Sequence, residues 1–148
     1  MDSNKEQIFA IKLISKAYVK KMNLNEYIIT EIECMQKYNH PNIVKLADYL
    51  EDDDFYYIVM EYCDTNLKNY MVLECNEKIG FPEERAKQIF YQIVKGMLTV
   101  HENGVIHRDL KLENILIKNG VFKIADFGLS KEVPQDMTTH TIAGTQDY

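Results

Sequence analysis

Hydrophobic positions in the first part of the chain follow strand spacing, then helix spacing, then strand spacing again. Residues 8–14, IFAIKLI, are apolar and rich in β-branched side chains except for Lys12, and this run predicts a buried strand. Over residues 25–38 the apolar positions recur every three or four residues, which predicts a helix with one apolar face. Residues 43–51 and 55–62 favour two more strands, and the acidic EDDD between them is interpreted as a solvated hairpin tip.

The clearest helical pattern lies in the second half, over residues 81–104. Pro82 suits the first helical turn and Asn103-Gly104 suits the end of a helix. The apolar stripe expected on this helix consists of Ala86, Ile89, Phe90, Ile93, Val94 and Met97. NILI and VFKIAD, on either side of the turn KNG, then predict two short strands. Strands and one helix therefore come first, and a mostly helical part with a small hairpin follows.

Composition places the chain among soluble globular proteins and narrows its partners. It has 148 residues, of which 46% are hydrophobic and 27% charged, with a net charge of −6. No basic field favours nucleic acid, and the apolar runs are too short for membrane insertion. The three cysteines show no metal-site spacing, and their odd number argues against a closed set of disulfides. We therefore expect a reducing, cytoplasmic or nuclear setting.

Four features carry candidate chemistry: Lys12 in a strand, Glu31 on a helix, HRDLKLEN at 107–114 and ADFG at 125–128. Each has a plain structural explanation when taken alone. A strand lysine can extend its ammonium to the surface, and a helical glutamate is usually solvated. Asp-Phe-Gly is a common turn. Their order along one chain, however, matches the signature set of protein kinases.

The chain thus resembles a eukaryotic protein kinase of the serine/threonine type. The resemblance implies an α+β, two-lobe protein-kinase fold that is incomplete, with residues 1–60 in the small lobe, 61–63 as the hinge and 64–148 in the large lobe, ending in the activation segment. No glycine precedes Gly80, so the glycine-rich hairpin that covers the nucleotide phosphates is expected to be absent. The last helices of the large lobe are likewise expected to be missing.

The resemblance also assigns roles to the polar residues of the motifs. Lys12 would contact the α- and β-phosphates of ATP, and Glu31 would pair with Lys12, whereas Glu33 would face another side of the helix. Asp109 would orient the attacking hydroxyl and accept its proton, and Lys111 would offer positive charge to the γ-phosphate.

Metal and adenine sites follow from the same resemblance. Asn114 and Asp126 would hold Mg²⁺, a cation that prefers oxygen ligands. The residues expected around the adenine ring are Ala10 and Leu116 on its two faces, Met60 as gatekeeper, and the backbone of Glu61 and Cys63. The residues expected to form an apolar spine between the lobes are Met35, Leu46, His107 and Phe127.

Substrate class and regulation are indicated by the activation segment. Lys111, two residues after Asp109, and Thr145 in GTQDY are typical of serine/threonine kinases acting on protein substrates. Arg108 would bind a phosphate on the activation loop, placed there by an upstream activating kinase. Thr141 is the candidate phosphosite, ahead of Thr138 and Thr139. FKIADFGLSK and TIAGT favour the calmodulin-dependent or autophagy-initiating branch.

Two functional hypotheses remain open at this point. The first is a catalytic serine/threonine kinase using ATP and Mg²⁺, of which these residues are a part that is inactive alone. The second is a non-catalytic, pseudokinase-like binding or regulatory fragment. The first hypothesis is favoured because five residues that catalysis needs are all present: Lys12, Glu31, Asp109, Asn114 and Asp126. A metal-binding module built on EDDD is disfavoured because its acidic residues lack regular ligand spacing.

Overall fold

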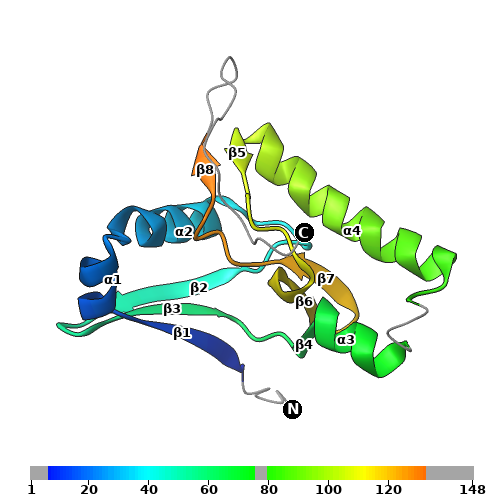
Figure 1. Ribbon diagram of the computed structural model, residues 1–148, viewed down its shortest axis with the longest axis horizontal. Helices are drawn as coiled ribbons and strands as arrows, with labels where there is room; N and C mark the ends of the chain where they lie inside the picture. The colour runs from blue at the N-terminus through cyan, green and yellow to red at the C-terminus, as the bar shows by residue number, and fades with distance from the viewer. Residues whose placement is uncertain (1–6, 76–79, 133–148) are drawn as a thin grey trace, which may run out of the picture.

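The computed structural model describes residues 7–75 and 80–132 of the chain. Two groups of elements lie side by side, a sheet with helices α1 and α2 and a second sheet with helices α3 and α4 (Figure 1). The elements in chain order are β1 (Phe9–Ser15), α1 (Lys16–Met22), α2 (Asn25–Lys37), β2 (Leu46–Glu51), β3 (Phe55–Glu61), β4 (Thr65–Asn66), α3 (Leu67–Glu74), α4 (Glu83–Glu102), β5 (Val105–Ile106), the 3-10 helix η1 (Leu112–Asn114), β6 (Ile115–Lys118), β7 (Val121–Ile124) and β8 (Lys131–Glu132).

The first sheet is antiparallel, in the order β1-β3-β2. Its β2–β3 turn carries the acidic residues EDDD, all of them exposed. The Asp52 carboxylate accepts hydrogen bonds from the backbone N–H groups of Asp54 and Phe55, at 2.8 and 2.7 Å. The predicted solvated hairpin tip is therefore confirmed, and its acidic residues are used to close the turn.

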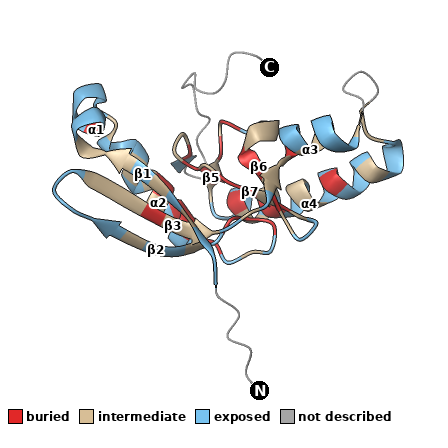
Figure 2. Cartoon of the chain, turned by 90° about the horizontal axis from the view of Figure 1, so that it is seen from below, coloured by how far each residue is buried: buried red, intermediate tan, exposed pale blue. Residues whose placement is uncertain are grey.

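The prediction that the first strand is buried was wrong. Side chains of β1 alternate between the two faces of the sheet, and Ile11 and Leu13 are 59% and 55% exposed. Lys12 and Ile14 lie on the other face, where Ile14 packs against the core. Figure 2 shows buried residues gathered in the middle of the molecule, with exposed residues along the outer strands. Apolar sequence alone did not reveal that this face has no cover within the described residues.

The second sheet, β4-β6-β7, is built around the predicted hairpin. Its turn residues Asn119 and Gly120 have φ values of 50° and 77°. Both values lie in the left-handed region, as a two-residue hairpin turn that matches the twist of its strands requires. The strands predicted at NILI and VFKIAD are confirmed as β6 and β7.

Helix α4 confirms the long helix predicted from the second half, but only part of its expected apolar stripe is buried. The buried side consists of Ile89, Gly96 and Val100, and the helix packs against β7. Phe90 and Val94 are 67% and 44% exposed. The stripe is wider than the surface that β7 offers within the described residues.

A short crossing joins the two sheets near the centre of the molecule. Ile43 forms a parallel bridge with Ile124 of β7. The Val44 N–H donates to the Ile124 carbonyl at 2.9 Å, and the Ile124 N–H donates to the Asn42 carbonyl at 2.9 Å. The strand predicted over residues 43–51 therefore begins later, at Leu46, because its first residues bond to the other sheet.

Two helices were not predicted, and each begins with a side-chain cap. The Ser15 hydroxyl accepts from the Tyr18 N–H ahead of α1, and the Asn66 side chain accepts from the Asn69 N–H ahead of α3. Both helices are short, so their apolar spacing spans too few turns to be distinctive.

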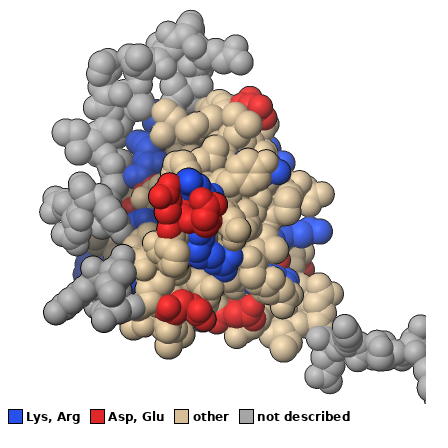
Figure 3. All heavy atoms as spheres, turned by 90° about the vertical axis from the view of Figure 1, so that its right-hand side faces the viewer, with Lys and Arg blue, Asp and Glu red and all other residues tan. Residues whose placement is uncertain are grey.

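Surface charge and helix length bear on the expected partners. On the face that carries α3 and the start of α4, acidic and basic side chains are interspersed, with no continuous basic area (Figure 3). Across residues 7–75 and 80–132, no helix combines the length and the apolar character that crossing a bilayer requires.

Candidate active site

Lys12 lies at the centre of an ion-pair group that joins three distant parts of the chain. Its ammonium contacts both Glu31 oxygens, at 2.6 and 2.9 Å, and the Asp126 carboxylate at 3.2 Å. Strand β1 directs Lys12 toward α2, and the second turn of α2 directs Glu31 toward Lys12. Glu33, two residues later, is exposed. The expected pairing of Lys12 with Glu31, and not with Glu33, is present in the structure.

Burial shapes the electrostatics of this ion pair. Burial opposes the charge on Lys12, but the nearby Glu31 and Asp126 carboxylates outweigh it and raise the pKa of the ammonium. Burial also raises the pKa of Glu31, and Lys12 works against that rise. The Glu31 side chain is only 3% exposed, and its contact with Lys12 is what favours the ionised form. The lysine is thus held, fully charged, beside Asp126.

Asp109 is the centre of a second polar group, in the loop that follows β5. Its side chain is buried, and one carboxylate oxygen accepts from Lys111 at 2.8 Å and from the Asn114 amide at 3.0 Å. The Asn114 amide also donates to the Asp109 carbonyl at 3.0 Å. Hydrogen bonding to Asp109 raises the pKa of Lys111. These contacts fix the carboxylate in one orientation.

The buried ring of His107 fixes the backbone of the Asp109 loop. The ring is 1% exposed, with Nε2 3.0 Å from the Ala125 carbonyl and Nδ1 3.3 Å from the Asp109 N–H. Burial lowers the pKa of His107, so the neutral ring donates from Nε2 and accepts at Nδ1. The ring also packs edge-on against Phe127, with centroids 5.0 Å apart. Of the other expected spine residues, Met35 and Leu46 belong to the same apolar core as Phe127.

The β6–β7 hairpin brings Asn114 and Asp126 to the same end of the second sheet. Asn114 immediately precedes β6, and its carbonyl accepts from the Ala125 N–H at 2.9 Å, one residue before Asp126. Asp126 has a φ of 64°, which turns the chain sharply after the strand. The hairpin therefore brings the backbones of Asn114 and Asp126 to the same end of the sheet.

Asn114 and Asp126 suit magnesium better than a metal ion whose ligands all come from the protein. Within the described residues, no group of three or more His, Cys, Asp or Glu side chains is arranged to hold a metal ion. Magnesium is commonly held by one or two protein ligands, with phosphate oxygens and waters completing its shell. The Asp126 side chain is 44% exposed, so it is open to such a ligand.

The residues expected around adenine lie where the two sheets meet. Ala10 is opposite Met60 in the β1–β3 ladder, and Glu61 ends β3. Cys63 lies in the connection to β4, and burial raises the pKa of its thiol to about 11, so the thiol stays protonated. Leu116, on β6, packs against the same core as Met60 and Cys63.

Comparison with known families decides what this arrangement belongs to. The family described as the protein kinase domain matches residues 1–148. The chain belongs to this family. Its α+β fold is the protein-kinase fold, and protein kinases in general use ATP and Mg²⁺ and act on protein substrates.

Several relatives of this kinase domain carry the names of serine/threonine kinases. The serine/threonine-protein kinase PLK4 of Danio rerio is 38% identical over 141 residues, which cover 94% of this chain and 15% of that protein. The serine/threonine-protein kinase polo of Drosophila melanogaster is 36% identical over 150 residues, covering 100% and 26%. A probable serine/threonine-protein kinase, fhkD of Dictyostelium discoideum, is 34% identical over 149 residues, covering 96% and 20%.

The chain thus spans 15% of the PLK4 relative and 26% of the polo relative. The relatives therefore show the family of this chain, and the activity of the whole protein that contains it is a proposal. These relatives do not decide between the branches favoured by the sequence, so the branch stays a prediction.

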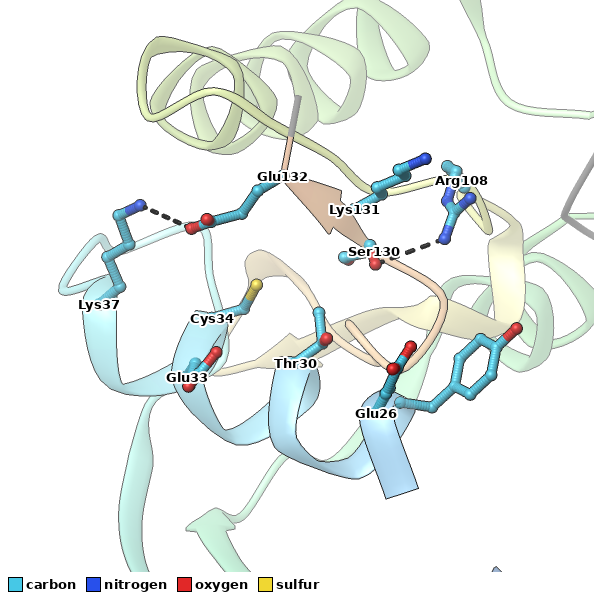
Figure 4. A pocket seen from close by; sticks show the side chains of 10 residues that line it. Glu26, Thr30, Glu33, Cys34, Lys37, Arg108, Ser130, Lys131 and Glu132 are labelled. Carbon is cyan, nitrogen blue, oxygen red and sulfur yellow. Dashed lines mark hydrogen bonds and ion pairs between the residues drawn. The ribbon is translucent and has the colours of Figure 1, made fainter. Parts of the chain in front are cut away.

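A pocket of the kinase domain lies between α2 and the segment around β8. It is lined by Arg108, Ser130, Lys131 and Glu132 on one side and by Glu26, Tyr27, Thr30, Glu33, Cys34 and Lys37 of α2 on the other (Figure 4). The Arg108 guanidinium donates to the Leu129 carbonyl at 2.7 Å. Its buried Nη1 has no hydrogen-bond partner among the described residues. Thr138, Thr139, Thr141 and Thr145 lie outside the residues that the structure describes.

Sequence reasoning missed the contacts of Glu61, which had been assigned a role only through its backbone. Its carboxylate pairs with Lys118 at 3.0 Å and with Lys123 at 2.9 Å. Lys123 is visible in the sequence as a charged residue inside an otherwise apolar strand, and Lys118 is the first residue of the turn KNG. Their common partner comes from the other sheet, so only the folded structure reveals it.

Proposed function

We propose that the protein containing these residues is a serine/threonine kinase that transfers the γ-phosphate of ATP to a hydroxyl group of a protein substrate. One observation carries the proposal: the fold joins the Lys12–Glu31–Asp126 ion-pair group to the Asp109–Lys111–Asn114 group through one hairpin. Each group contains the residue types that phosphoryl transfer uses for positioning and for charge stabilisation. A solvated lysine or an isolated turn does not account for both groups together.

The proposed chemistry rests on where these side chains are held. Asp109, fixed by Asn114, orients the incoming hydroxyl and takes up its proton. Lys111, beside Asp109, and Lys12, beside Asp126, offer positive charge to phosphate oxygens. Asn114 and Asp126 hold magnesium, which when bound neutralises charge on the phosphates. Ala10, Met60, Glu61, Cys63 and Leu116 form the adenine site.

Serine and threonine are the proposed acceptors. The direct contact between Lys111 and Asp109 is one support, because a serine/threonine kinase carries that lysine two residues after its aspartate. The names of the relatives are another. Thr145 is proposed to approach this pair when the substrate loop is in place.

Phosphorylation of Thr141 by an upstream kinase is the proposed means of activation. The support is Arg108, a half-buried residue that lines the pocket beside Lys131 and whose Nη1 has no hydrogen-bond partner among the described residues. A phosphate there would accept a hydrogen bond from the Arg108 nitrogen that has no partner among the described residues.

The net charge of −6 favours neither nucleic acid nor an anionic membrane as a partner, and we propose that the protein acts in the cytoplasm or nucleus.

Transfer of radiolabelled γ-phosphate to a mixture of peptides, followed by analysis of the labelled amino acids, tests the proposal. The wild-type full-length protein should label serine or threonine and not tyrosine. Asp109→Asn should lower kcat by about a hundredfold or more, because it removes the base. Asp53→Asn, the same change at the exposed hairpin tip, should be silent. Mg-ATP binding without any transfer by the wild type would instead support the pseudokinase-like alternative.

A further inference from the structure

The segment that connects the two sheets is fastened to the β6–β7 hairpin at both of its ends. At its start, the Glu61 carboxylate accepts from Lys118 and Lys123 of the hairpin. At its end, the Asp64 N–H donates to the Ile117 carbonyl at 2.7 Å, and the Asp64 carboxylate accepts from the Asn119 N–H at 2.9 Å. We call residues 61–64 the connecting segment, and Glu61, Lys118 and Lys123 the Glu61 cluster.

Glu61 is more buried and makes more hydrogen bonds than the residues of an ordinary surface ion pair. Its side chain is 16% exposed, and that of Lys123 is 11% exposed. Besides the two lysines, the carboxylate accepts from the Lys45 N–H at 2.9 Å, while the Glu61 N–H donates to the Lys45 carbonyl at 3.0 Å. Burial opposes ionisation of Glu61, but the hydrogen bonds from Lys123, the Lys45 N–H and Lys118 outweigh it and lower the pKa. The residue therefore has a single, charged arrangement.

The same hairpin carries other parts of the proposed nucleotide site. Its open end positions Asn114 and Asp126, the proposed magnesium ligands, and Leu116 lies opposite Lys123 in the ladder. The Glu61 cluster spans the length of the hairpin, from Lys118 next to the turn to Lys123 one position before the open end. One rigid element thus contacts the connecting segment, which would bind the base, and the residues that would bind the phosphates. A single ATP molecule must satisfy both at once.

From this geometry we infer that Lys118 and Lys123 are positioning residues for ATP: through Glu61 they fix the connecting segment at the distance from Asn114 and Asp126 that the nucleotide spans. The inference rests on the proposed function. It adds that two lysines without contact to the reacting atoms set the affinity for ATP. Loss of the cluster should weaken ATP binding while leaving the chemical step largely intact, because Asp109 and its partners lie outside the cluster.

Matched substitutions in the full-length protein test this inference. Lys123→Met should raise the KM and the Kd for Mg-ATP on the order of tenfold, since a small displacement of a binding group has large effects. Its kcat should stay within roughly twofold of the wild type. Lys123→Arg, which can keep the ion pair, should restore the affinity. Lys87→Met removes two ion pairs, to Glu83 and Glu84, far from the connecting segment, and should change neither quantity.

A measurement without nucleotide separates this inference from the proposed function. Amide hydrogen exchange at Glu61 and Asp64 should accelerate in Lys123→Met, because their N–H groups, which donate to the carbonyls of Lys45 and Ile117, lie at the two ends of the connecting segment. If the wild type binds no ATP, the proposed function fails whatever these amides do. If the wild type binds ATP and Lys123→Met binds it equally well, or if kcat changes instead of KM, the positioning role is wrong. Lys118→Met, at a more exposed lysine, gives the same comparison should Lys123→Met not fold.

Discussion

At the scale of single residues, the charge on Lys12 and the burial of Glu31 depend on each other. The Glu31 carboxylate is almost fully enclosed, and Lys12 contacts both of its oxygens. An enclosed carboxylate without its cation is costly, so neither residue can be changed independently. The pair therefore holds the lysine in one place beside Asp126 and does not simply add stability.

Substitution of Glu31 and Glu33, two of the three glutamates of α2, tests this interpretation directly. Glu31→Gln keeps the shape of the side chain but removes the charge that holds Lys12, so kcat/KM should fall roughly ten- to a hundredfold. Glu33→Gln is the matched control, because Glu33 is exposed on the same helix. Steady-state kinetics on both variants measures the difference. Equal losses in the two variants would show that the pairing has no special role.

His107 makes the stability of the protein depend on pH. Burial lowers its pKa from the ordinary value of 6.5, so the unfolded chain takes up a proton before the folded one does. Its contribution to stability is complete above pH 6.5 and is lost as the pH falls from there through the folded pKa. Urea unfolding at pH 7.5 and pH 5.5 should therefore give a lower free energy of unfolding at about pH 5.5.

The change His107→Phe should reduce this pH dependence, because Phe carries no titrating nitrogen, and should leave the part that comes from His40, whose pKa burial also lowers. His101→Phe, at an exposed position near the end of α4, should leave it unchanged. A pH dependence that survives undiminished in His107→Phe would mean that His107 is not responsible for it.

At the scale of elements, α4 lies unusually close to the crossing between the sheets. A Cβ added at Gly96 would meet the Asn42 carbonyl oxygen at 2.7 Å and a methyl group of Ile124 at 2.8 Å. Asn42 is fixed there, since its carbonyl accepts from Ile124 and its amide donates to the Phe122 carbonyl at 2.8 Å. A glycine in this helix is thus needed for packing and not for its backbone freedom.

Gly96→Ala reverses the usual effect of such a change. In an open helix, alanine is more favourable than glycine by about 1 kcal/mol. Here we expect a loss of roughly 1–3 kcal/mol in the free energy of unfolding, because a backbone carbonyl cannot move aside as a side chain can. Chemical denaturation measures it. Leu98→Ala, at an exposed position two residues later, is the control. A stabilised Gly96→Ala would contradict the close packing.

Elements with a strong periodic pattern were predicted well, and those defined by contacts between distant residues were not. The helix at 25–37 and the hairpin around Asn119-Gly120 follow from spacing and turn chemistry alone. The exposed face of β1 does not, because an apolar strand carries no record of which face is covered. The late start of β2 has the same cause: Asn42 and Val44, on either side of Ile43, form hydrogen bonds to Ile124, far along the chain.

At the scale of the whole molecule, the candidate site was predicted by motif and assembled by topology. The motifs identified Lys12, Glu31, Asp109, Asn114 and Asp126, and their order in the chain indicated the family. No pattern in the sequence showed that Lys12 lies 3.2 Å from Asp126, or that Glu61 is held by the same hairpin that positions Asn114. Such contacts depend on how the two sheets meet.

We propose that the fold brings a nucleotide-binding residue, Lys12, and a catalytic residue, Asp109, together for phosphoryl transfer. Mg-ATP binding and γ-phosphate transfer, measured on the same full-length proteins, test this proposal: the wild type, Asp109→Asn and Lys12→Met. The wild type should bind and transfer. Asp109→Asn should still bind Mg-ATP, but its rate of phosphate transfer should fall by about a hundredfold or more. Lys12→Met should be weakened in both Mg-ATP binding and phosphate transfer. Full transfer by Asp109→Asn, or no binding of Mg-ATP by the wild type, would contradict the account.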